Sequence, residues 1–320
     1  MKFRFFCVLI VFMMFTGCNC KKIKCQPRDW KQPIDIPISN IVYNTLETGP
    51  DNGGRMHEVL GFYNMNTGEI TTIDLKSPLM TPFYLNSDTI IAINKLGELG
   101  FEDEFSGYPF IFTKNNYITC NTPESTGWWM QPYQGNVLID SITGINLISS
   151  KDCSLIRSVL LHDQFAGSKG MNGIGPFSLS SDGTFIIVES DDKLYQINLT
   201  NLEVFDYHKA GMHPAISPDQ KLVVYDSLRD GIHIMDINGE NDRLIANFES
   251  NTYDAYGGER GIPPRPRWSS DGKKLTYHKC TALGIANGCT DINDYSIYIY
   301  NFVSQTESKI IDGGLNPSWR

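Results

Sequence analysis

The sequence predicts an all-β fold, a six-bladed β-propeller with seven blades as the alternative, and three observations support this prediction. A short phrase that begins with Pro recurs along the chain. An apolar run follows each copy, and segments that alternate apolar and polar side chains come next. Residues 18–320 contain no strong amphipathic pattern long enough for a helix of three turns. Each interval between copies can hold the four short strands of one propeller blade.

The repeated phrase consists of Pro, an aromatic or apolar residue, a Ser-Asp turn and an apolar strand. Pro266–Gly272 and Pro214–Gln220 are its clearest copies, whereas the copy at Pro132 lacks the Ser-Asp turn. Pro fixes φ and donates no backbone hydrogen bond, so it suits the start of an innermost strand. Asp accepts hydrogen bonds from the backbone two residues further on, which favours a tight turn. The six copies begin at Pro82, Pro132, Pro176, Pro214, Pro266 and Pro317.

The two ends of the chain are predicted to share one blade. The last copy, Asn316–Arg320, starts the phrase and is followed by no further strand. Residues 38–76 read as three strands without a preceding phrase. If the C-terminal segment supplies the innermost strand and the N-terminal segment the other three, the ring closes without a free edge. Counting this shared blade once gives six blades.

The best copy of the phrase resembles a known repeat. Pro266–Gly272 reads Pro-Arg-Trp-Ser-Ser-Asp-Gly and is similar to the TolB-type propeller repeat, whose pattern is close to Pro-x-Trp-Ser-Pro-Asp-Gly. The resemblance covers roughly residues 38–320 and implies a propeller fold. Such repeats occur in periplasmic binding proteins, in lipoproteins and as non-catalytic parts of peptidases, so the resemblance indicates architecture rather than activity.

The N-terminus carries the pattern of a bacterial lipoprotein signal. A basic start, Met1–Arg4, precedes the apolar run Phe5–Phe15, which is too short to span a bilayer. Phe15-Thr-Gly-Cys18 then resembles a lipobox. We therefore expect a signal peptide over 1–17, a lipidated Cys18 that begins a tether over 18–37, and a propeller over 38–320. A plain secretory signal that contains Cys18 by chance is the alternative.

The cysteines suggest disulfides rather than a metal site. Cys7 lies in the signal, and six cysteines besides Cys18 remain for an oxidising compartment. Cys280 and Cys289 flank a short loop, so we expect a disulfide that staples a hairpin. For the remaining four cysteines, elimination alone suggests that Cys120 pairs with Cys153 and Cys20 with Cys25. Their connectivity stays open. Because the chain lacks a C-x-x-C pair and histidines at ligand spacing, we predict no metal and no cofactor.

The sequence offers no recognisable catalytic arrangement. No G-x-S-x-G turn and no H-E-x-x-H motif occurs, so we assign no catalytic residue and expect no enzyme activity. A propeller lyase or hydrolase is the least favoured alternative. A formal net charge of −9 would repel phosphate backbones, which disfavours nucleic acid as a general partner.

A binding surface is expected where loops lead into the innermost strands. Tyr, Trp and Arg at such loops suit peptide or glycan recognition. For the two tyrosines, packing between blades is an equally weighted alternative, and Trp128 is expected to pack. The candidate residues are His208 and His213 beside Pro214; Tyr253, Tyr256 and Arg260 in a polar-aromatic insertion; and Arg265 and Arg267 on either side of Pro266.

These observations predict a cell-envelope lipoprotein whose propeller binds a protein partner or acts as a scaffold. The alternative is a propeller that binds a glycan, a peptide or a small ligand. The lipid would be the only membrane attachment. The outer membrane, the periplasmic face and the cell surface all remain open as locations.

Overall fold

A computed structural model describes most of the chain. The described residues are 36–37, 39–48, 56–73, 79–95, 107–113, 116–120, 129–141, 144–161, 174–227, 230–247, 264–281 and 292–320. Contacts divide the chain into two units, Met1–Pro33 and Ile34–Arg320, and all described residues belong to the second. The predicted signal peptide, Cys18 and most of the predicted tether lie outside the described residues.

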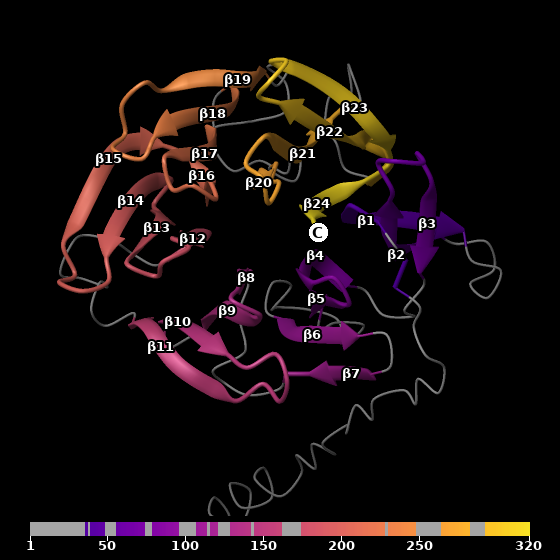
Figure 1. Cartoon of the computed structure of the whole chain (residues 1–320), viewed down its shortest axis with the longest axis horizontal. Helices are drawn as coiled ribbons and strands as arrows, with labels where there is room; N and C mark the ends of the chain where they lie inside the picture. Colours follow the sequence, from indigo (N-terminus) through magenta and orange to yellow (C-terminus); the bar gives the residue numbers. More distant parts are fainter. Residues whose placement is uncertain are drawn as a thin grey trace, which may run out of the picture. The chain divides into compact units, whose positions relative to one another are not determined.

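The second unit consists of six four-stranded antiparallel sheets arranged in a ring (Figure 1). We number these blades in chain order and give their strands from the centre outwards. Blade 1 contains β24 (Leu315–Trp319), β1 (Ile41–Thr48), β2 (Met56–Tyr63) and β3 (Ile70–Ile73). Blade 2 contains β4 (Leu79–Asn86), β5 (Thr89–Lys95), β6 (Gly107–Thr113) and β7 (Asn116–Thr119). Blade 3 contains β8 (Met130–Tyr133), β9 (Asn136–Ser141), β10 (Gly144–Ile148) and β11 (Leu155–Leu161).

The other three blades repeat this order. Blade 4 contains β12 (Phe177–Leu179), β13 (Phe185–Ser190), β14 (Lys193–Asn198) and β15 (Val204–Ala210). Blade 5 contains β16 (Met212–Ile216), β17 (Leu222–Ser227), β18 (Gly231–Asp236) and β19 (Arg243–Asn247). Blade 6 contains β20 (Arg267–Trp268), β21 (Lys274–Cys280), β22 (Tyr295–Asn301) and β23 (Thr306–Asp312). A 3-10 turn, η4 (Ile292–Asp294), precedes β22. Among the described residues, no helix is long and apolar enough to cross a membrane.

The predicted six blades and the shared blade are confirmed, and the alternative of seven is wrong. β24 pairs with β1 in antiparallel register, with Ile41 opposite Trp319 and Val42 opposite Ser318. The amide of Arg320 also donates to the Asn40 carbonyl at 2.9 Å. The C-terminal strand therefore lies innermost in the blade that the N-terminal strands complete, and the ring closes (Figure 1).

The repeated phrase lies where the sequence predicts it, at the innermost strand of every blade. Pro132 begins a blade despite its missing Ser-Asp turn, because it pairs with Val137 of β9. In the complete copies, the Ser hydroxyl donates to the Asp, as Ser217 does to Asp219 at 2.7 Å. The Ser217 oxygen also accepts from the Leu222 amide at 2.9 Å. The hydrogen bond from Ser217 contributes most to lowering the pKa of Asp219. The same Ser-Asp bond forms at Ser180–Asp182 and Ser269–Asp271.

The core lies between neighbouring blades and is built mainly from the second strand of each. Ile186, Ile187 and Val188 of β13 have no exposed surface. Such a continuous apolar run is expected where both faces of a strand are covered. Tryptophans of the phrase also connect blades by hydrogen bonds: Trp268 Nε1 donates to Ala215 O at 2.9 Å, and Trp319 Nε1 donates to Arg267 O at 3.1 Å. The phrase therefore forms a turn and also attaches its blade to the preceding one.

A disulfide joins Cys120 to Cys153 and links two blades. Cys120 follows β7 of blade 2, and Cys153 lies in the turn between β10 and β11 of blade 3. Both are buried in one apolar cluster with Phe83 and Val137. This pairing agrees with the one reached by elimination. Cys280 is also disulfide-bonded, but Cys289 lies outside the described residues, so the pairing of these two stays a prediction.

Candidate functional site

Two arginines extend across the centre of the ring from blade 6. Arg265 and Arg267 stand on either side of Pro266, where the chain enters the innermost strand. The Cζ of Arg265 lies 4.7 Å from the centroid of the Trp129 ring, at the start of blade 3. The Cζ of Arg267 lies 4.9 Å from the ring centroid of Phe83 in blade 2. Because neither partner belongs to a neighbouring blade, both guanidinium groups cross the centre rather than follow the rim.

His213 of blade 5 joins the same group of side chains. Its ring centroid lies 5.0 Å from that of Trp129, in an edge-to-face arrangement. Only 2% of His213 is exposed, and neither ring nitrogen has a hydrogen-bond partner among the residues that the structure describes. We call Phe83, Trp129, His213, Arg265 and Arg267 the central cluster.

The backbone at His213 is unusual for a residue that precedes proline. Its φ is 50°, in the left-handed region, whereas steric contact with proline normally keeps the preceding residue extended. The pairing of β16 with β17 shifts register between Met212 and Ala215, around this residue. A left-handed φ outside glycine costs about 1–3 kcal/mol and persists only where the surroundings impose it. The fold thus maintains a strained backbone at a buried histidine.

Burial and mutual repulsion control the charges of the central cluster. Burial, followed by the positive charges of Arg265 and Arg267, lowers the pKa of His213 well below 6.5, so the imidazole is neutral at pH 7. Burial, and then the charge of Arg267, lowers the pKa of Arg265 to about 9. Burial lowers the pKa of Arg267 to about 10. Both guanidinium groups therefore stay cationic at neutral pH.

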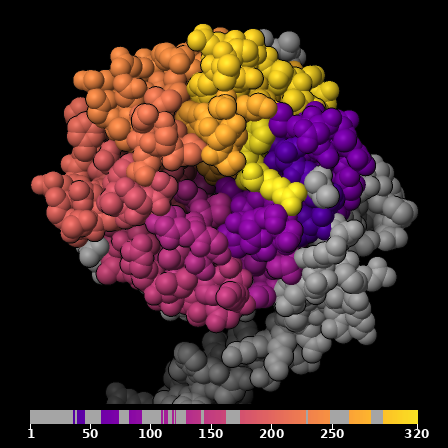
Figure 2. Space-filling view, viewed as in Figure 1, coloured from indigo at the N-terminus to yellow at the C-terminus, as the bar shows by residue number. Residues whose placement is uncertain are grey.

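Arg267 has few partners for its five donors. Its Nη1 donates to Pro266 O at 3.5 Å, a long hydrogen bond. Among the described residues, no carboxylate forms an ion pair with it. The aromatic ring of Phe83 provides cation–π attraction of roughly 0.5–2 kcal/mol, but it offers the N–H groups no lone-pair acceptor. Arg265 and Arg267 are half-buried when the whole residue is considered. The surface seen in Figure 2 is hollowed near the centre of the ring.

The structure brings together three of the predicted site residues: His213, Arg265 and Arg267. The sequence predicts His208 beside His213 at the binding surface, and this placement is wrong, because His208 does not lie at the centre. It belongs to β15, the outermost strand of blade 4; its side chain is 84% exposed and lies 3.2 Å from Asp206. Gly211 alone separates β15 from the innermost strand β16, so five residues carry the chain from the outer edge to the centre. Tyr253, Tyr256 and Arg260 lie outside the described residues.

Sequence reasoning missed Trp129 and Phe83 as members of the site. Phe83 follows Pro82 directly, as Arg267 follows Pro266, so the aligned phrases placed both at the same position in their blades. Trp129 precedes Pro132 by three residues, next to Trp128. The positions of these residues within the phrase were visible in the sequence, but their contacts across the ring were not.

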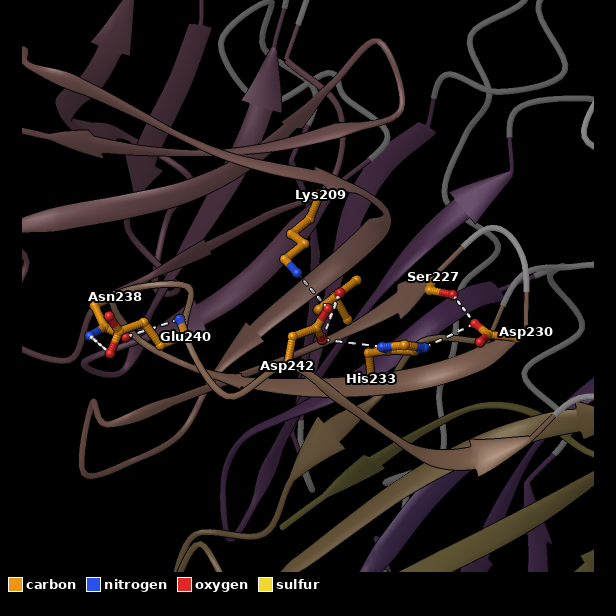
Figure 3. Close-up of polar contacts among 8 residues, drawn as sticks. Lys209, Ser227, Asp230, His233, Asn238, Glu240 and Asp242 are labelled. Carbon is orange, nitrogen blue, oxygen red and sulfur yellow. Dashed lines mark hydrogen bonds and ion pairs between the residues drawn. The ribbon is translucent and has the colours of Figure 1, made fainter.

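A second polar cluster connects blades 4 and 5 away from the centre (Figure 3). His233 Nε2 lies 2.9 Å from Asp230 Oδ1, and His233 Nδ1 lies 3.1 Å from Asp242 Oδ1. Lys209 of blade 4 donates to Asp242 at 2.8 Å, and Tyr225 donates to the same carboxylate at 2.9 Å. Although burial raises the pKa of Asp242, the bonds from Lys209, Tyr225 and His233 hold it below its usual value.

The second cluster has the arrangement of a structural network. The Ser227 hydroxyl donates to Asp230 and not to the imidazole of His233. A nucleophile activated by histidine requires the hydroxyl to bond the imidazole, with a carboxylate on its other side. Here each imidazole nitrogen instead meets a carboxylate. We therefore assign these residues to holding blade 5 together and attaching it to blade 4.

These observations define the class as a six-bladed β-propeller with a cationic and aromatic centre. No protein-family model and no curated protein matches the sequence. The fold is similar to that of a solved structure described as putative TolB from Agrobacterium tumefaciens, with a TM-score of 0.54 and 12% identity over 81% of this chain and 92% of that one. It is also similar to a structure described as a putative 6-phosphogluconolactonase from Bacteroides uniformis, with a TM-score of 0.50 and 15% identity over 88% of this chain and 98% of that one. The predicted TolB-type architecture is thus confirmed, and identities this low establish the fold alone.

Proposed function

We propose that the protein is a non-enzymatic binding module of the bacterial cell envelope that captures a partner protein at the centre of its ring. The central cluster is the observation that carries this proposal. Arginine and tryptophan are the residue types that dominate binding energy when they lie in desolvated, well-packed positions. Here they converge from blades 3 and 6, with Phe83 and His213 from two further blades.

The envelope location is proposed from the N-terminal sequence. The apolar run Phe5–Phe15 and the lipobox-like segment ending at Cys18 support export and lipid attachment. Metabolic labelling with an alkyne fatty acid tests this directly. The wild-type chain should carry the label in the membrane fraction, and the Cys18→Ser variant should not. A labelled Cys18→Ser variant would refute the assignment.

A pull-down from detergent-solubilised envelope tests the binding function. The bait is the full chain in three forms: wild type, Arg265→Gln with Arg267→Gln, and the matched control Arg157→Gln with Arg243→Gln, whose arginines are exposed on outermost strands. We expect one stoichiometric protein with the wild type and the control, and its loss with the central variant. Absence of a stoichiometric protein from the wild-type bait would overturn the proposal.

A glycan- or small-ligand-binding propeller is the second candidate. It is favoured by the aromatic rings of Trp129 and Phe83 beside cationic donors, since flat apolar faces and a few polar groups are typical of small-molecule sites. Glycan-array binding without a protein partner would support it. A hydrolase or lyase screen that finds turnover abolished by His213→Asn would refute the non-enzymatic assignment of both candidates.

A further inference from the structure

We infer that the central cluster is a carboxylate-binding site, with Arg267 as its main ligand and Arg265 and His213 as flanking donors. This inference rests on the proposed binding function and specifies its chemistry. A peptide and a free small acid are the two possible sources of the carboxylate, and a peptide probe in two forms distinguishes them.

The charge balance of the cluster favours an anion. Two guanidinium groups approach closely enough for the charge of Arg267 to lower the pKa of Arg265. No carboxylate among the described residues forms an ion pair with Arg267. A half-buried cation without a counterion is costly, and a site that keeps one gains free energy when an anion enters. The propeller thus holds an unfavourable charge at Arg267 that a bound anion would relieve.

The geometry of Arg267 leaves its hydrogen-bonding edge available. Phe83 lies against the guanidinium at 4.9 Å, and the bond from Nη1 to Pro266 O is 3.5 Å long. An aromatic ring supplies no lone-pair acceptor, so most of the five N–H donors of the fork remain for a ligand. Two parallel N–H groups match the two oxygens of a carboxylate in a bidentate pair.

His213 provides an independent observation that points to a ligand. It is 2% exposed, and its two ring nitrogens have no hydrogen-bond partner among the described residues. A buried polar group without a partner costs about 1–3 kcal/mol, and such groups are rare in native proteins. A neutral imidazole carries one N–H donor, so a carboxylate oxygen beside Trp129 would satisfy it.

The surrounding rings favour a carboxylate over a phosphate. A carboxylate carries its charge at one end and continues as carbon at the other, so its apolar portion can pack on Trp129 and Phe83. A phosphate monoester presents oxygens on several sides and about two negative charges, so part of its polar surface would face aromatic rings without a donor. We therefore expect a flat organic acid to bind more tightly than the corresponding phosphate.

The test compares three matched probes on the full chain: benzoate, its uncharged isostere benzamide, and phenyl phosphate. The arginine Nε–H cross-peak that disappears in Arg267→Gln reports on the site by NMR. Benzoate should shift this peak saturably, benzamide should not, and phenyl phosphate should bind more weakly. Equal saturable shifts with benzoate and benzamide, or tighter binding of phenyl phosphate, would overturn the inference.

Two substitutions and one control locate the binding, measured by calorimetry with benzoate. Arg267→Gln should weaken binding at least about tenfold, because a charge-assisted pair is lost. Arg267→Lys keeps the charge but loses the fork, so it should also weaken binding several-fold. Arg243→Gln should leave affinity unchanged. Wild-type affinity in both Arg267 variants would place the anion elsewhere and refute the inference.

Binding of one tetrapeptide, with a free C-terminus and as its C-terminal amide, distinguishes the two sources of the carboxylate. A tetrapeptide with a free C-terminus that binds, while its C-terminal amide does not, identifies a peptide carboxylate; benzoate binding alone identifies a free small acid. Either result supports the inference, and failure of both refutes it. If the pull-down partner binds the Arg267→Gln variant normally and neither benzoate nor the peptide binds the wild type, the binding function stands and the carboxylate site is refuted. If benzoate binds but no partner exists, the protein-binding proposal alone fails.

Discussion

Replacing Arg267 by Gln should make the empty protein more stable while it removes the proposed binding. Keeping a charge on this residue, whose pKa falls from 12.5 to about 10, costs the folded state about 3 kcal/mol. Arg267 as a whole residue is only half-buried, and the contact with Phe83 would be lost, so the net gain is smaller. We expect about 1–2 kcal/mol in the free energy of unfolding.

Thermal unfolding measures this gain. For a domain of this size, about 1–2 kcal/mol corresponds to a rise in Tm of roughly 2–5 °C. Gln keeps part of the aliphatic stem, so loss of packing should be small. Arg243→Gln is the control, since Arg243 is exposed on β19 and its substitution should change stability by less than about 0.5 kcal/mol. A fall in Tm for Arg267→Gln would refute the view that this charge is held at a cost for binding.

Three further predictions concern the ring. Replacing Cys120 and Cys153 by Ser should lower stability by about 3–4 kcal/mol, because the disulfide closes a 33-residue separation between blades; differential scanning calorimetry of the two proteins without reductant should show this loss, and an unchanged Tm would contradict it. Deleting residues 315–320 should lower Tm by at least about 6 °C or abolish cooperative unfolding, since blade 1 loses its innermost strand; unchanged unfolding would contradict ring closure by this strand. Asp242→Asn should cost about 1–3 kcal/mol near pH 7. The pKa of Asp242 is lower in the folded state, so its carboxylate stabilises the fold above the unfolded pKa, and this contribution is lost as pH falls through the folded pKa. In urea titrations, the difference in unfolding free energy between wild type and Asp242→Asn should therefore shrink towards low pH. A difference that does not change with pH would contradict this reasoning.

The architecture could be predicted because each signal for it is local. A Ser-Asp turn forms within a few residues, as the bonds around Ser217 and Asp219 show, and an apolar strand follows it directly. Repetition of these local signals gives the number of blades without any knowledge of long-range contacts. The shared blade was also predictable, since an unfinished phrase at one end complements strands that lack a phrase at the other.

The central cluster could be predicted only in part because its contacts are not local. Arg265 meets Trp129 from a blade three positions further round the ring, and sequence spacing carries no signal for that approach. His208 shows the opposite error. It lies only five residues before His213, and proximity in sequence suggested a pair, but the step from an outermost to an innermost strand separates the two residues.

The residue directly before the proline differs in chemistry and in contacts from blade to blade. Blade 3 has Gln131 there, whose Oε1 accepts from the Leu179 amide at 3.2 Å and so attaches blade 4. Blade 4 has Gly175, where a Cβ would lie 1.8 Å from the Glu189 carboxylate, so this carboxylate fills the space of a side chain.

Blades 5 and 6 instead place His213 and Arg265 at this position, and both contact Trp129 across the ring. Turn residues of the phrase repeat because each blade needs them, whereas the residue before the proline is free to differ once its blade is closed. A site built from such positions can change its ligand without changing the fold, because the residues that recognise and the residues that fold are separate. This separation explains why the sequence predicts the propeller strongly and its ligand weakly, and it directs substitutions for altered specificity to the positions on either side of the prolines.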